Sequence, residues 1–475
     1  MNWILLTCLL CTFGFIKEMR PSEAFLTLYL TGEWKNLTIE QVSNEIYPWW
    51  TYSYLIWLVP VFLLTDFLRY KPILVVDAAA AIGTWALLLW TQGVVAMKFV
   101  EVLYGLFTAG EVAYYSYLYV EVPKEHFKKI SSFTRAATLV GKFVSFLLAQ
   151  FLYSFNVMDY YDLHVFSFVS VCIAFLIPLV LPWPEHSEIF HRAKYNDDTE
   201  NNETTKSEKK DSKQDSGDRS CKDHVHQHED RREQEKTQTA QPVSGERKSC
   251  MDGFVFMWTE VKDVYRSRVV LVWSVWWAIA SCGNFQVLNY VQNLWAVISA
   301  QDSPGKQEDV YNGAVEATST LLGSVTVMLV GFVPVQWSER AELFMSVVCA
   351  GNAAFLIVMA HTSSIWVAYV MYVLFRTSYV TVVTIATAQI AQHLVKHRYG
   401  LVFGCNMFAS LVLESLLTVI VVDKAGLGAG VVDQFTVYGG YFGVISVLFL
   451  TGCLYRCYRP HKSVDLDVHL DVPEA

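Results

Sequence analysis

Apolar residues along the chain come in blocks of about twenty, the length at which one α-helix crosses the hydrocarbon core of a bilayer. Shorter segments of strict alternation, which would indicate a transmembrane β-barrel, do not occur in the sequence. The pattern therefore predicts an all-α membrane protein that crosses the bilayer many times. The twelve predicted spans centre on residues 4–30, 50–65, 73–92, 97–119, 133–154, 162–182, 268–295, 311–334, 342–360, 365–393, 400–421 and 435–456.

The segment 185–265 differs in kind, because it is crowded with charged and polar residues and nearly lacks apolar ones before Met251. Such a segment cannot bury a core, so it is predicted to be disordered. It divides the spans six and six, which is typical of the major facilitator fold with its substrate site between two halves. We predict an N-terminal half at 1–184, a cytoplasmic central loop at 185–265, a C-terminal half at 266–457 and a cytoplasmic tail at 458–475.

Basic residues in the short connections predict the orientation. Every second connection is rich in Lys and Arg, and the positive-inside rule places that set in the cytoplasm. Both termini are then cytoplasmic, which agrees with an even number of spans. The richer set holds Arg69, Lys71, Lys124, Lys128, Lys129, Arg135, Arg340, Lys396, Arg398, Arg456, Arg459 and Lys462, and the poorer set holds little more than Lys35, Lys306 and Lys424.

The first predicted span is interrupted by the charges and the proline of 17–23. Such breaks are tolerated where the backbone lines a cavity or packs on protein. The amino terminus lacks a basic region and a clear cleavage site, so it is predicted to be the first span rather than a removed signal peptide. The sequon that begins at Asn36 lies in the first outside connection, and we predict that Asn36 is glycosylated.

Composition supports the membrane class and excludes several activities. The chain is 53% hydrophobic and 17% charged, with a mean hydropathy of +0.31, whereas soluble domains carry about a quarter charged residues. The net charge of −9 and the ten cysteines indicate neither a nucleic-acid partner nor a disulfide or metal site. Because no phosphate-binding loop or catalytic constellation is present in the sequence, we expect no enzyme, no ATP-driven pump and no cofactor.

Two glutamates stand in the apolar stretch 99–119, where each charged side chain costs roughly 2.5–3.5 kcal/mol or more to bury. Glu101, Tyr104, Glu111 and Tyr115 follow helical spacing and share one face. The stripe predicts an acidic wall of a polar pathway. A buried carboxylate can also exchange a proton near neutral pH, so proton coupling is an open possibility.

Further polar and aromatic residues are predicted at membrane depth, and acids outnumber the single arginine. That balance favours a cation, or a neutral ligand whose donors a carboxylate can accept, and the aromatic faces suit a flat cationic ring. Structural alternatives stay open: Asn289 as a tie between helices, Trp50 as part of an aromatic belt, and Glu23 as an interfacial ion pair with Arg20. The candidate site residues are Glu23, Trp50, Glu101, Tyr104, Glu111, Asn289, Glu316, Arg376 and Glu414.

Several stretches from the first span to the eleventh resemble the folate and thiamine transporter family, the reduced folate carrier family of the major facilitator superfamily. They begin at Met19, Lys35, Thr51, Pro60, Trp273, Tyr311, Leu374 and Leu401, and read MRPSEAF, KNLT, TYSYL, PVFLLTDFLRYKP, WSVWW, YNGAVEA, LFRTSY and LVFG. The resemblance implies a plasma-membrane uptake carrier that works by alternating access. It leaves two alternatives: a carrier of reduced folate or other organic anions, and a non-transporting membrane receptor.

Charge indicates the branch of the family. Folate carriers place bases at the positions matching Glu111 and Glu414, whereas both are acids here. The segments 109–115 and 286–292 are similar to those of the thiamine-transporting members. The implied substrate is thiamine, a monocation with an aminopyrimidine and a thiazolium ring, and related organic cations are possible further substrates.

The same resemblance implies roles for the candidate residues. Glu101 and Asn289 would hydrogen-bond the aminopyrimidine, while Trp50 and Tyr104 would stack on the rings. The remaining acids would set the negative field, and these are Glu23, Glu111 and Glu316. The chain departs from the thiamine pattern at Arg376 and Glu414, which are predicted as a possible supporting ion pair.

Overall fold

The computed structural model describes residues 3–121, 127–183, 259, 262–302, 310–330, 337–393 and 399–458. The chain divides into one unit of Met1–Pro184 with Asp263–Ala475 and a second unit of Glu185–Lys262. The first unit carries the helices described below. The predicted central loop lies almost wholly outside the described residues, as does the tail beyond Tyr458, so their disorder stays a prediction.

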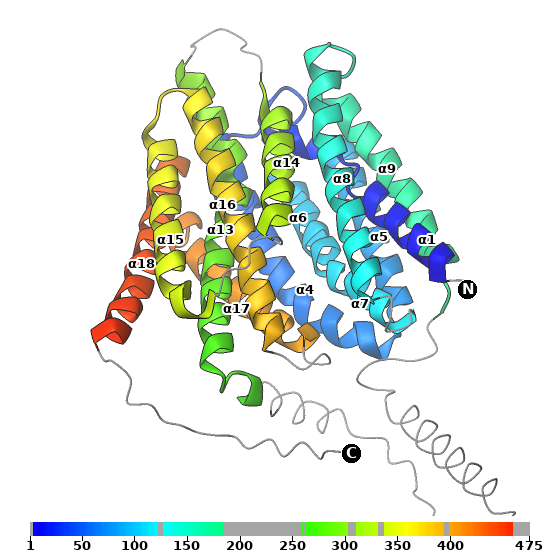
Figure 1. Ribbon diagram of the computed structural model, residues 1–475. Coiled ribbons are helices and arrows are strands. Elements are labelled where there is room, and N and C mark those ends of the chain that lie inside the picture. The colour runs from blue at the N-terminus through cyan, green and yellow to red at the C-terminus, as the bar shows by residue number, and fades with distance from the viewer. Residues whose placement is uncertain are drawn as a thin grey trace, which may run out of the picture. The chain divides into compact units, whose positions relative to one another are not determined.

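Helices account for all of the regular structure in the described residues (Figure 1). The N-terminal part comprises α1 (Trp3–Lys17), the 3-10 turn η1 (Pro21–Phe25), α2 (Leu26–Thr31), α3 (Ile39–Gln41), the π-helical turn η2 (Val42–Ile46), α4 (Pro48–Phe67), α5 (Lys71–Trp90), α6 (Val94–Ala109), α7 (Glu111–Glu121), α8 (Phe127–Ser154) and α9 (Tyr160–Val180). The C-terminal part comprises α13 (Arg268–Asp302), α14 (Asn312–Val330), α15 (Trp337–His361), α16 (Ile365–Gln392), α17 (Tyr399–Leu417), the π-helical turn η5 (Thr418–Val422) and α18 (Val431–Tyr458).

Eight helices in the described residues are long and apolar enough to cross a membrane. The other four predicted spans are helical at their expected positions but interrupted or more polar. The first ends early at Lys17, and α6 and α7 are separate helices that meet at Gly110. The starts of α4 and α14 are rich in aromatic or hydroxyl side chains, which lowers their hydropathy. The prediction of an all-α, multi-pass membrane protein is confirmed.

Two local features explain the interruptions. Pro21 stands at the start of η1, where the missing backbone N–H does not disrupt a helix. Gly110 faces Asp77 so closely that a Cβ at this position would overlap the Asp77 carboxyl group, and a Cβ at Gly105 would overlap Ser53. These two glycines let α6 and the start of α7 approach α4 and α5.

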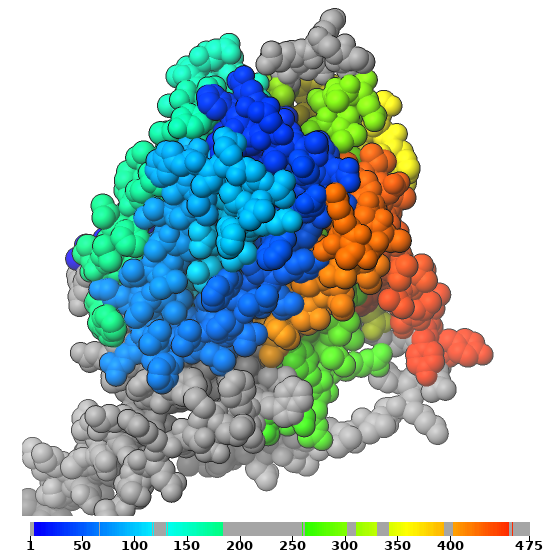
Figure 2. Space-filling view, turned by 180° about the vertical axis from the view of Figure 1, so that it is seen from behind, coloured from blue at the N-terminus to red at the C-terminus, as the bar shows by residue number. Residues whose placement is uncertain are grey.

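Helix contacts hold each part together and join the two parts. In the N-terminal part, α5 packs on α6 and α9, α4 packs on α6, and α1 packs on α8 and α9. In the C-terminal part, α15 packs on α16 and α18, and α13 packs on α16, α17 and α18. The parts meet where α8 contacts α14 and α4 contacts α17, and Figure 2 shows the blue N-terminal and orange C-terminal segments side by side on one face.

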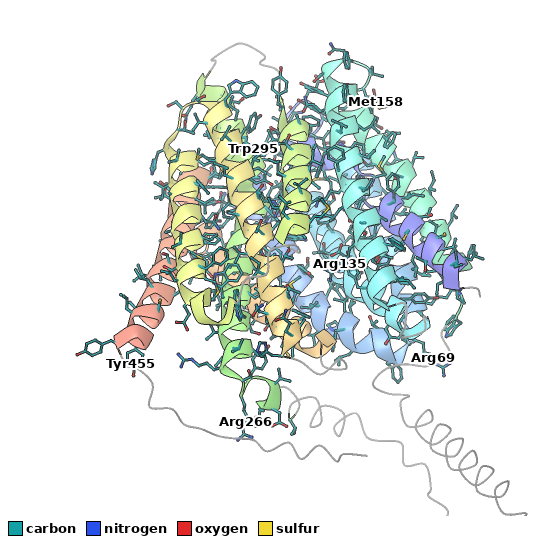
Figure 3. All side chains as sticks on the ribbon, viewed as in Figure 1. Arg69, Arg135, Met158, Arg266, Trp295 and Tyr455 are labelled. Carbon is teal, nitrogen blue, oxygen red and sulfur yellow. The ribbon has the colours of Figure 1, made fainter. Side chains whose placement is uncertain are left out.

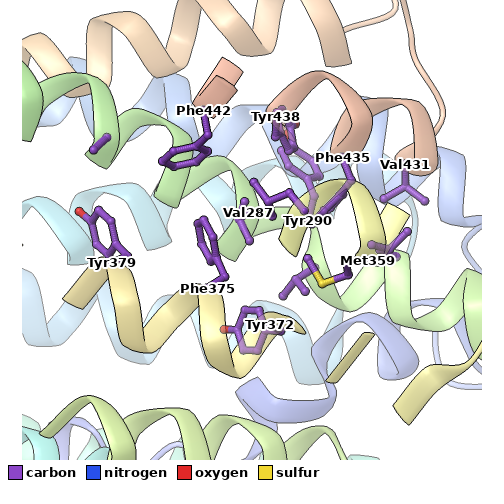
Figure 4. Close-up of a cluster of buried hydrophobic side chains, with 14 of the residues drawn as sticks. Val287, Tyr290, Met359, Tyr372, Phe375, Tyr379, Val431, Phe435, Tyr438 and Phe442 are labelled. Atoms are coloured by element: carbon purple, nitrogen blue, oxygen red, sulfur yellow. The ribbon is translucent and has the colours of Figure 1, made fainter. Parts of the chain in front are cut away.

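Aromatic rings fill much of the C-terminal core, where α13, α16 and α18 converge (Figure 4). Phe375 and Phe442 meet edge to face with their centroids 5.5 Å apart. Trp295 makes edge contacts with Tyr369 and Tyr372 at 5.1 and 5.0 Å. This packing fixes the inner faces of the helices that carry Asn289 and Arg376.

Connections at the two ends of the helices carry different residues. Figure 3 places Arg69 and Arg266 at one end of the helices and Met158 at the other. We call the end that carries residues 32–47 and 423–430 the predicted outer end. Its assignment to the outside of the cell stays a prediction.

Candidate functional site

Glu101 on α6 is a buried carboxylate that has no side-chain partner in the part of the chain that the structure describes. Its residue is 6% exposed, and its backbone oxygen accepts a hydrogen bond from Ser53 Oγ at 3.1 Å. Within the described residues, however, no side chain hydrogen-bonds or ion-pairs with its carboxyl group. A desolvated carboxylate in this state is costly to keep and is available to a ligand that brings donors.

Trp50 of α4 and Tyr104 of α6 form an aromatic wall, and Tyr104 shares α6 with Glu101. Their ring centroids are 6.4 Å apart with an interplanar angle of 40°. Trp50 donates its indole N–H to Thr108 Oγ1 at 3.3 Å, which fixes the ring against α6. Both rings are half-buried. The contacts favour a position inside the helix bundle for Trp50 over an aromatic belt.

Glu23 of η1 is ion-paired rather than isolated. Its Oε1 accepts a hydrogen bond from the Tyr104 hydroxyl at 2.9 Å and lies 3.0 Å from Arg20. Arg20 also donates to Glu18 at 2.9 Å. The ion pair that sequence analysis left as an alternative is present, but Arg20 is 4% exposed and lies among helices rather than at a membrane surface.

Glu111, which opens α7, stands among charges from other helices. Lys17, Lys142 and Arg20 all act on it electrostatically, together with the like charge of Glu18. The acidic stripe read from one helix is therefore balanced by bases from α1, the segment after it and α8. Sequence analysis missed these bases because periodicity along one helix does not show which residues of other helices face it.

Lys17 has its own buried partner, which sequence analysis also missed. Its Nζ lies 2.9 Å from Asp77 Oδ2, and the two side chains are 6% and 0% exposed. The ammonium group also lies 4.4 Å from the Phe107 ring centroid. The available signal was one acid in the apolar span of α5 and one base at the end of α1.

The C-terminal candidates are held by different helices. Glu316 of α14 accepts a hydrogen bond from the Tyr372 hydroxyl at 2.7 Å. Asn289 of α13 has a buried Nδ2 without a hydrogen-bond partner among the described residues. Glu414 of α17 is 0% exposed, accepts from Thr51 at 3.2 Å through Oε1, and has no partner for Oε2 in that part of the chain.

The suggested ion pair between Arg376 and Glu414 does not form in the structure. Arg376 of α16 donates to Asn284 Oδ1 on α13 at 3.1 Å. Glu414 instead faces Thr51 of α4. The reason is packing: α16 lies on α13, whereas α17 lies between α13 and α4, so the two side chains extend toward different neighbours.

The two parts bring their candidates together through α13. Gln292, one turn beyond Asn289, donates to the backbone oxygen of Glu23 at 2.8 Å. Tyr290 on the same helix interacts electrostatically with both Glu101 and Glu414. Residues of α13 therefore reach both parts: Tyr290 acts on Glu101 of the N-terminal part and Glu414 of the C-terminal part, and Gln292 binds η1.

Polar contacts also join the two parts at the predicted outer end. Thr27 donates to Asn293 Oδ1 at 2.8 Å, and Asn293 donates to Ser43 Oγ at 2.7 Å. Asn44 donates to the carbonyl oxygen of Val422 at 2.6 Å. These bonds link η1–α2 and η2 to α13 and η5. The described conformation is closed by these contacts at that end.

The glycosylation candidate Asn36 is exposed in the connection before α3. Its backbone has a φ of 53°, a left-handed conformation that Asn tolerates better than most residues. The side-chain amide donates to the carbonyl oxygen of Glu33 at 3.0 Å. The position is accessible, and its glycosylation stays a prediction.

Residues 1–437 match the family model described as reduced folate carrier. The chain belongs to the reduced folate carrier family. This membership confirms the predicted family and the prediction of a transporter rather than an enzyme.

The relatives include carriers named for two vitamins. Thiamine transporter 2 of Macaca fascicularis is 41% identical over 98% of this chain and 93% of its own length. Thiamine transporter 1 of Homo sapiens is 42% identical over 94% of this chain and 89% of its own. The reduced folate transporter of Homo sapiens is 36% identical over 97% of this chain and 74% of its own.

Solved structures show the fold. The nucleoside transporter NupG matches with a TM-score of 0.57 at 10% identity, over 95% of this chain and 99% of that one. The xylose transporter XylE from E. coli matches with a TM-score of 0.56 at 9% identity, over 94% and 96%. The predicted major facilitator fold is confirmed.

Proposed function

We propose that this chain takes up thiamine, and related flat organic cations, across the plasma membrane by alternating access. The observation that carries the proposal is the unpaired, buried carboxylate of Glu101 on the helix that also supplies Tyr104 to the aromatic wall. A buried carboxylate and an aromatic ring supplied by one helix favour a planar cation over an anion. The identity to proteins named thiamine transporters 1 and 2 adds support.

The residues divide the recognition of the substrate between two chemistries. Glu101 would accept a hydrogen bond from the exocyclic amine of the aminopyrimidine. The partnerless Nδ2 of Asn289 would donate to a ring nitrogen. Trp50 and Tyr104 would stack on the rings of thiamine. Glu23, Glu111 and Glu316 would act indirectly, by setting the electrostatic field of the site together with the side chains around them.

A reduced-folate carrier is the second candidate, and one observation favours it. Lys17, Lys142 and Arg20 act electrostatically on the position of Glu111, and bases there would suit a ligand with an anionic tail. Against it stand Glu101 and Glu414, because two buried carboxylates without an ion pair among the described residues would repel such a tail. The balance supports the cation.

Competition for uptake separates the two candidates. In cells that express the chain, we expect unlabelled thiamine to suppress uptake of radiolabelled thiamine at concentrations at least about tenfold lower than folate requires. Trp50→Ala should reduce uptake strongly because it removes one face of the aromatic wall. Trp90→Ala is the matched control, since Trp90 is 65% exposed. Equal competition by folate, or wild-type uptake by Trp50→Ala, would contradict the proposal.

The same cells test proton coupling, which the unpaired carboxylates make chemically reasonable. Uptake is compared at equal external pH with the transmembrane pH gradient intact and then collapsed by a protonophore. A coupled carrier should lose accumulation when the gradient collapses, whereas a facilitative carrier should keep its initial rate. Control cells without the chain correct for background uptake.

Opening of the predicted outer end should depend on pH. Lys424 donates to Glu45 Oε1 at 2.9 Å, and this bond lowers the pKa of Glu45. The ion pair of Glu45 therefore stabilises the closed state fully at a pH above the usual pKa of glutamate. This stabilisation is lost as the pH falls through the lowered pKa of Glu45. When the pH is lowered from about 7 to about 4, the fraction of molecules whose two parts have separated at the predicted outer end should rise by a factor of about two. The effect is this small because the ion pair is partly exposed.

Spin labels at exposed positions on the two parts measure that opening. Glu33 and Leu427 are exposed and lie in the connections of the predicted outer end. The distance distribution between labels there should shift with pH in the parent, whereas Glu45→Gln should show the wider population already near neutral pH. A pH response that survives unchanged in Glu45→Gln would assign it to another group.

A further inference from the structure

Arg20 occupies a buried position between two carboxylates. Its guanidinium nitrogens lie 2.9 Å from Glu18 Oε2 and 3.0 Å from Glu23 Oε1. The same group lies 4.9 Å from the Phe107 ring centroid and 5.5 Å from that of Trp85. A planar guanidinium fits this arrangement because it can bind in two directions while stacking on rings.

The contact continues from Arg20 to the aromatic wall. Glu23 Oε1, which faces Arg20, also accepts the hydrogen bond from the Tyr104 hydroxyl at 2.9 Å. Tyr104 is the ring that faces Trp50. The position of the Tyr104 ring edge is thus tied to the side-chain conformation of Glu23, which depends in turn on Arg20.

The backbone of η1 is held independently of this chain of contacts. Gln292 donates to the carbonyl oxygen of Glu23 at 2.8 Å. Trp85 donates to Ser22 Oγ at 3.1 Å, and the Ser22 amide donates to Ser167 Oγ at 3.1 Å. Loss of Arg20 would therefore release the Glu23 side chain without removing the bonds that hold the turn.

We infer that Arg20 is a positioning residue for substrate binding, which acts through Glu23 to set the Tyr104 ring opposite Trp50. The inference rests on the proposed function and deepens it. Arg20 also neutralises Glu23, so Glu101 is the acid of the N-terminal part that remains available to a cationic ring. Glu23 is then a support for the aromatic wall rather than a direct ligand.

A lysine at position 20 isolates the geometric role from the charge. Arg20→Lys keeps a positive charge, but a single ammonium cannot reproduce the fork that binds both carboxylates. We expect Arg20→Lys to raise the KM for thiamine about tenfold while the maximal rate per transporter at the cell surface stays within about twofold. Tyr104→Phe, which removes the hydroxyl, should raise KM to a similar extent.

A double-mutant cycle decides whether the two residues act through one chain of contacts. Arg20→Lys together with Tyr104→Phe should raise KM no more than the larger single change, because either substitution breaks the same connection. Arg20→Lys together with Glu316→Gln is the control pair. Glu316 binds Tyr372 in the C-terminal part, so those two effects should multiply.

Two results would overturn the inference. The first is a KM of the double variant Arg20→Lys/Tyr104→Phe that equals the product of the two single effects. The second is an Arg20→Lys variant that has the wild-type KM but a lower amount of protein at the cell surface. If Arg20→Lys does not reach the surface, Glu18→Gln provides the second variant. It removes the far anchor of Arg20 and leaves Glu23 paired, and a KM equal to the wild type would overturn the inference.

Failure of the proposed function is distinguishable from failure of this inference. A wild-type chain that takes up no thiamine would refute the proposed function alone. The contact between Arg20 and Tyr104 is then tested by the thermal midpoints of four ligand-free proteins: the wild type, Arg20→Lys, Tyr104→Phe and the double variant. A midpoint shift in the double variant smaller than the sum of the two single shifts would support the positioning contact. A shift equal to that sum would overturn it.

Discussion

Replacing Lys17 with methionine is expected to lower the free energy of unfolding by about 3–5 kcal/mol, the cost of breaking one side of a buried ion pair. Lys17 Nζ lies 2.9 Å from Asp77 Oδ2, and the Asp77 side chain is fully buried. Methionine keeps a long unbranched side chain at this position but removes the ammonium group, which leaves the carboxylate without the cation of its ion pair. The measurement is the thermal midpoint of the purified protein, together with its amount at the cell surface.

A second substitution tests the cause. Lys17→Met with Asp77→Leu removes both charges, and buried pairs replaced by apolar residues often lose little stability. We therefore expect the double variant to recover most of the midpoint lost by the single one. Lys424→Met is the matched control, because its pair with Glu45 is partly exposed and should contribute little. An unchanged midpoint for Lys17→Met would mean that the pair does not support the fold.

The second large effect is expected for Glu101→Gln, which should lower kcat/KM for thiamine about a hundredfold through loss of a charge-assisted hydrogen bond. The carboxylate is buried and has no partner among the described residues, so its charge is available to the substrate. For the same reason, the substitution should leave the thermal midpoint equal or higher, because it removes an uncompensated buried charge. Initial uptake rates over a range of thiamine concentrations give the kinetic result.

Glu111→Gln is the matched control for that prediction. Lys17, Lys142 and Arg20 act electrostatically on Glu111, so loss of its charge should change kcat/KM less than about tenfold. The contrast is informative because both acids lie on one stripe of the sequence. A larger loss in Glu111→Gln than in Glu101→Gln would reverse the assignment of the substrate-binding acid.

The two substitutions should therefore move stability in opposite directions. Asp77 is a buried acid that needs its cation, whereas Glu101 is a buried acid that pairs with no cation among the described residues. Loss of Lys17 creates an uncompensated charge, and loss of the Glu101 charge removes one. This difference separates a carboxylate that supports the fold from one that is kept for a ligand.

Much of the fold could be predicted from the apolar blocks and the breaks between them. The interruption at 17–23 was visible as charges and a proline, and the structure begins η1 at Pro21. The break at Gly110 was not predicted, because an isolated glycine in an apolar helix is a weak signal. The need for glycine there comes from the Asp77 carboxyl group, which belongs to another helix and leaves no room for a Cβ.

The candidate site was predicted less completely than the fold. Glu101, Trp50 and Tyr104 could be chosen because an acid or aromatic ring at membrane depth is unusual in the sequence itself. The partner of Arg376 could not be chosen, and the structure gives it Asn284 rather than Glu414. The partner of Glu111 was missed for the same reason, since its bases come from α1, the following segment and α8.

The sequence by itself determined the class of protein, the positions of the helices, the family and the sign of the charges at membrane depth. Tertiary structure alone decided which of those charges are compensated. Helical periodicity tells which face of its own helix a residue occupies, but not which neighbour packs there. Lys17 and Asp77 are 60 residues apart and become one buried pair, whereas Glu101, on the same predicted acidic stripe as Glu111, pairs with no cation in the described ranges.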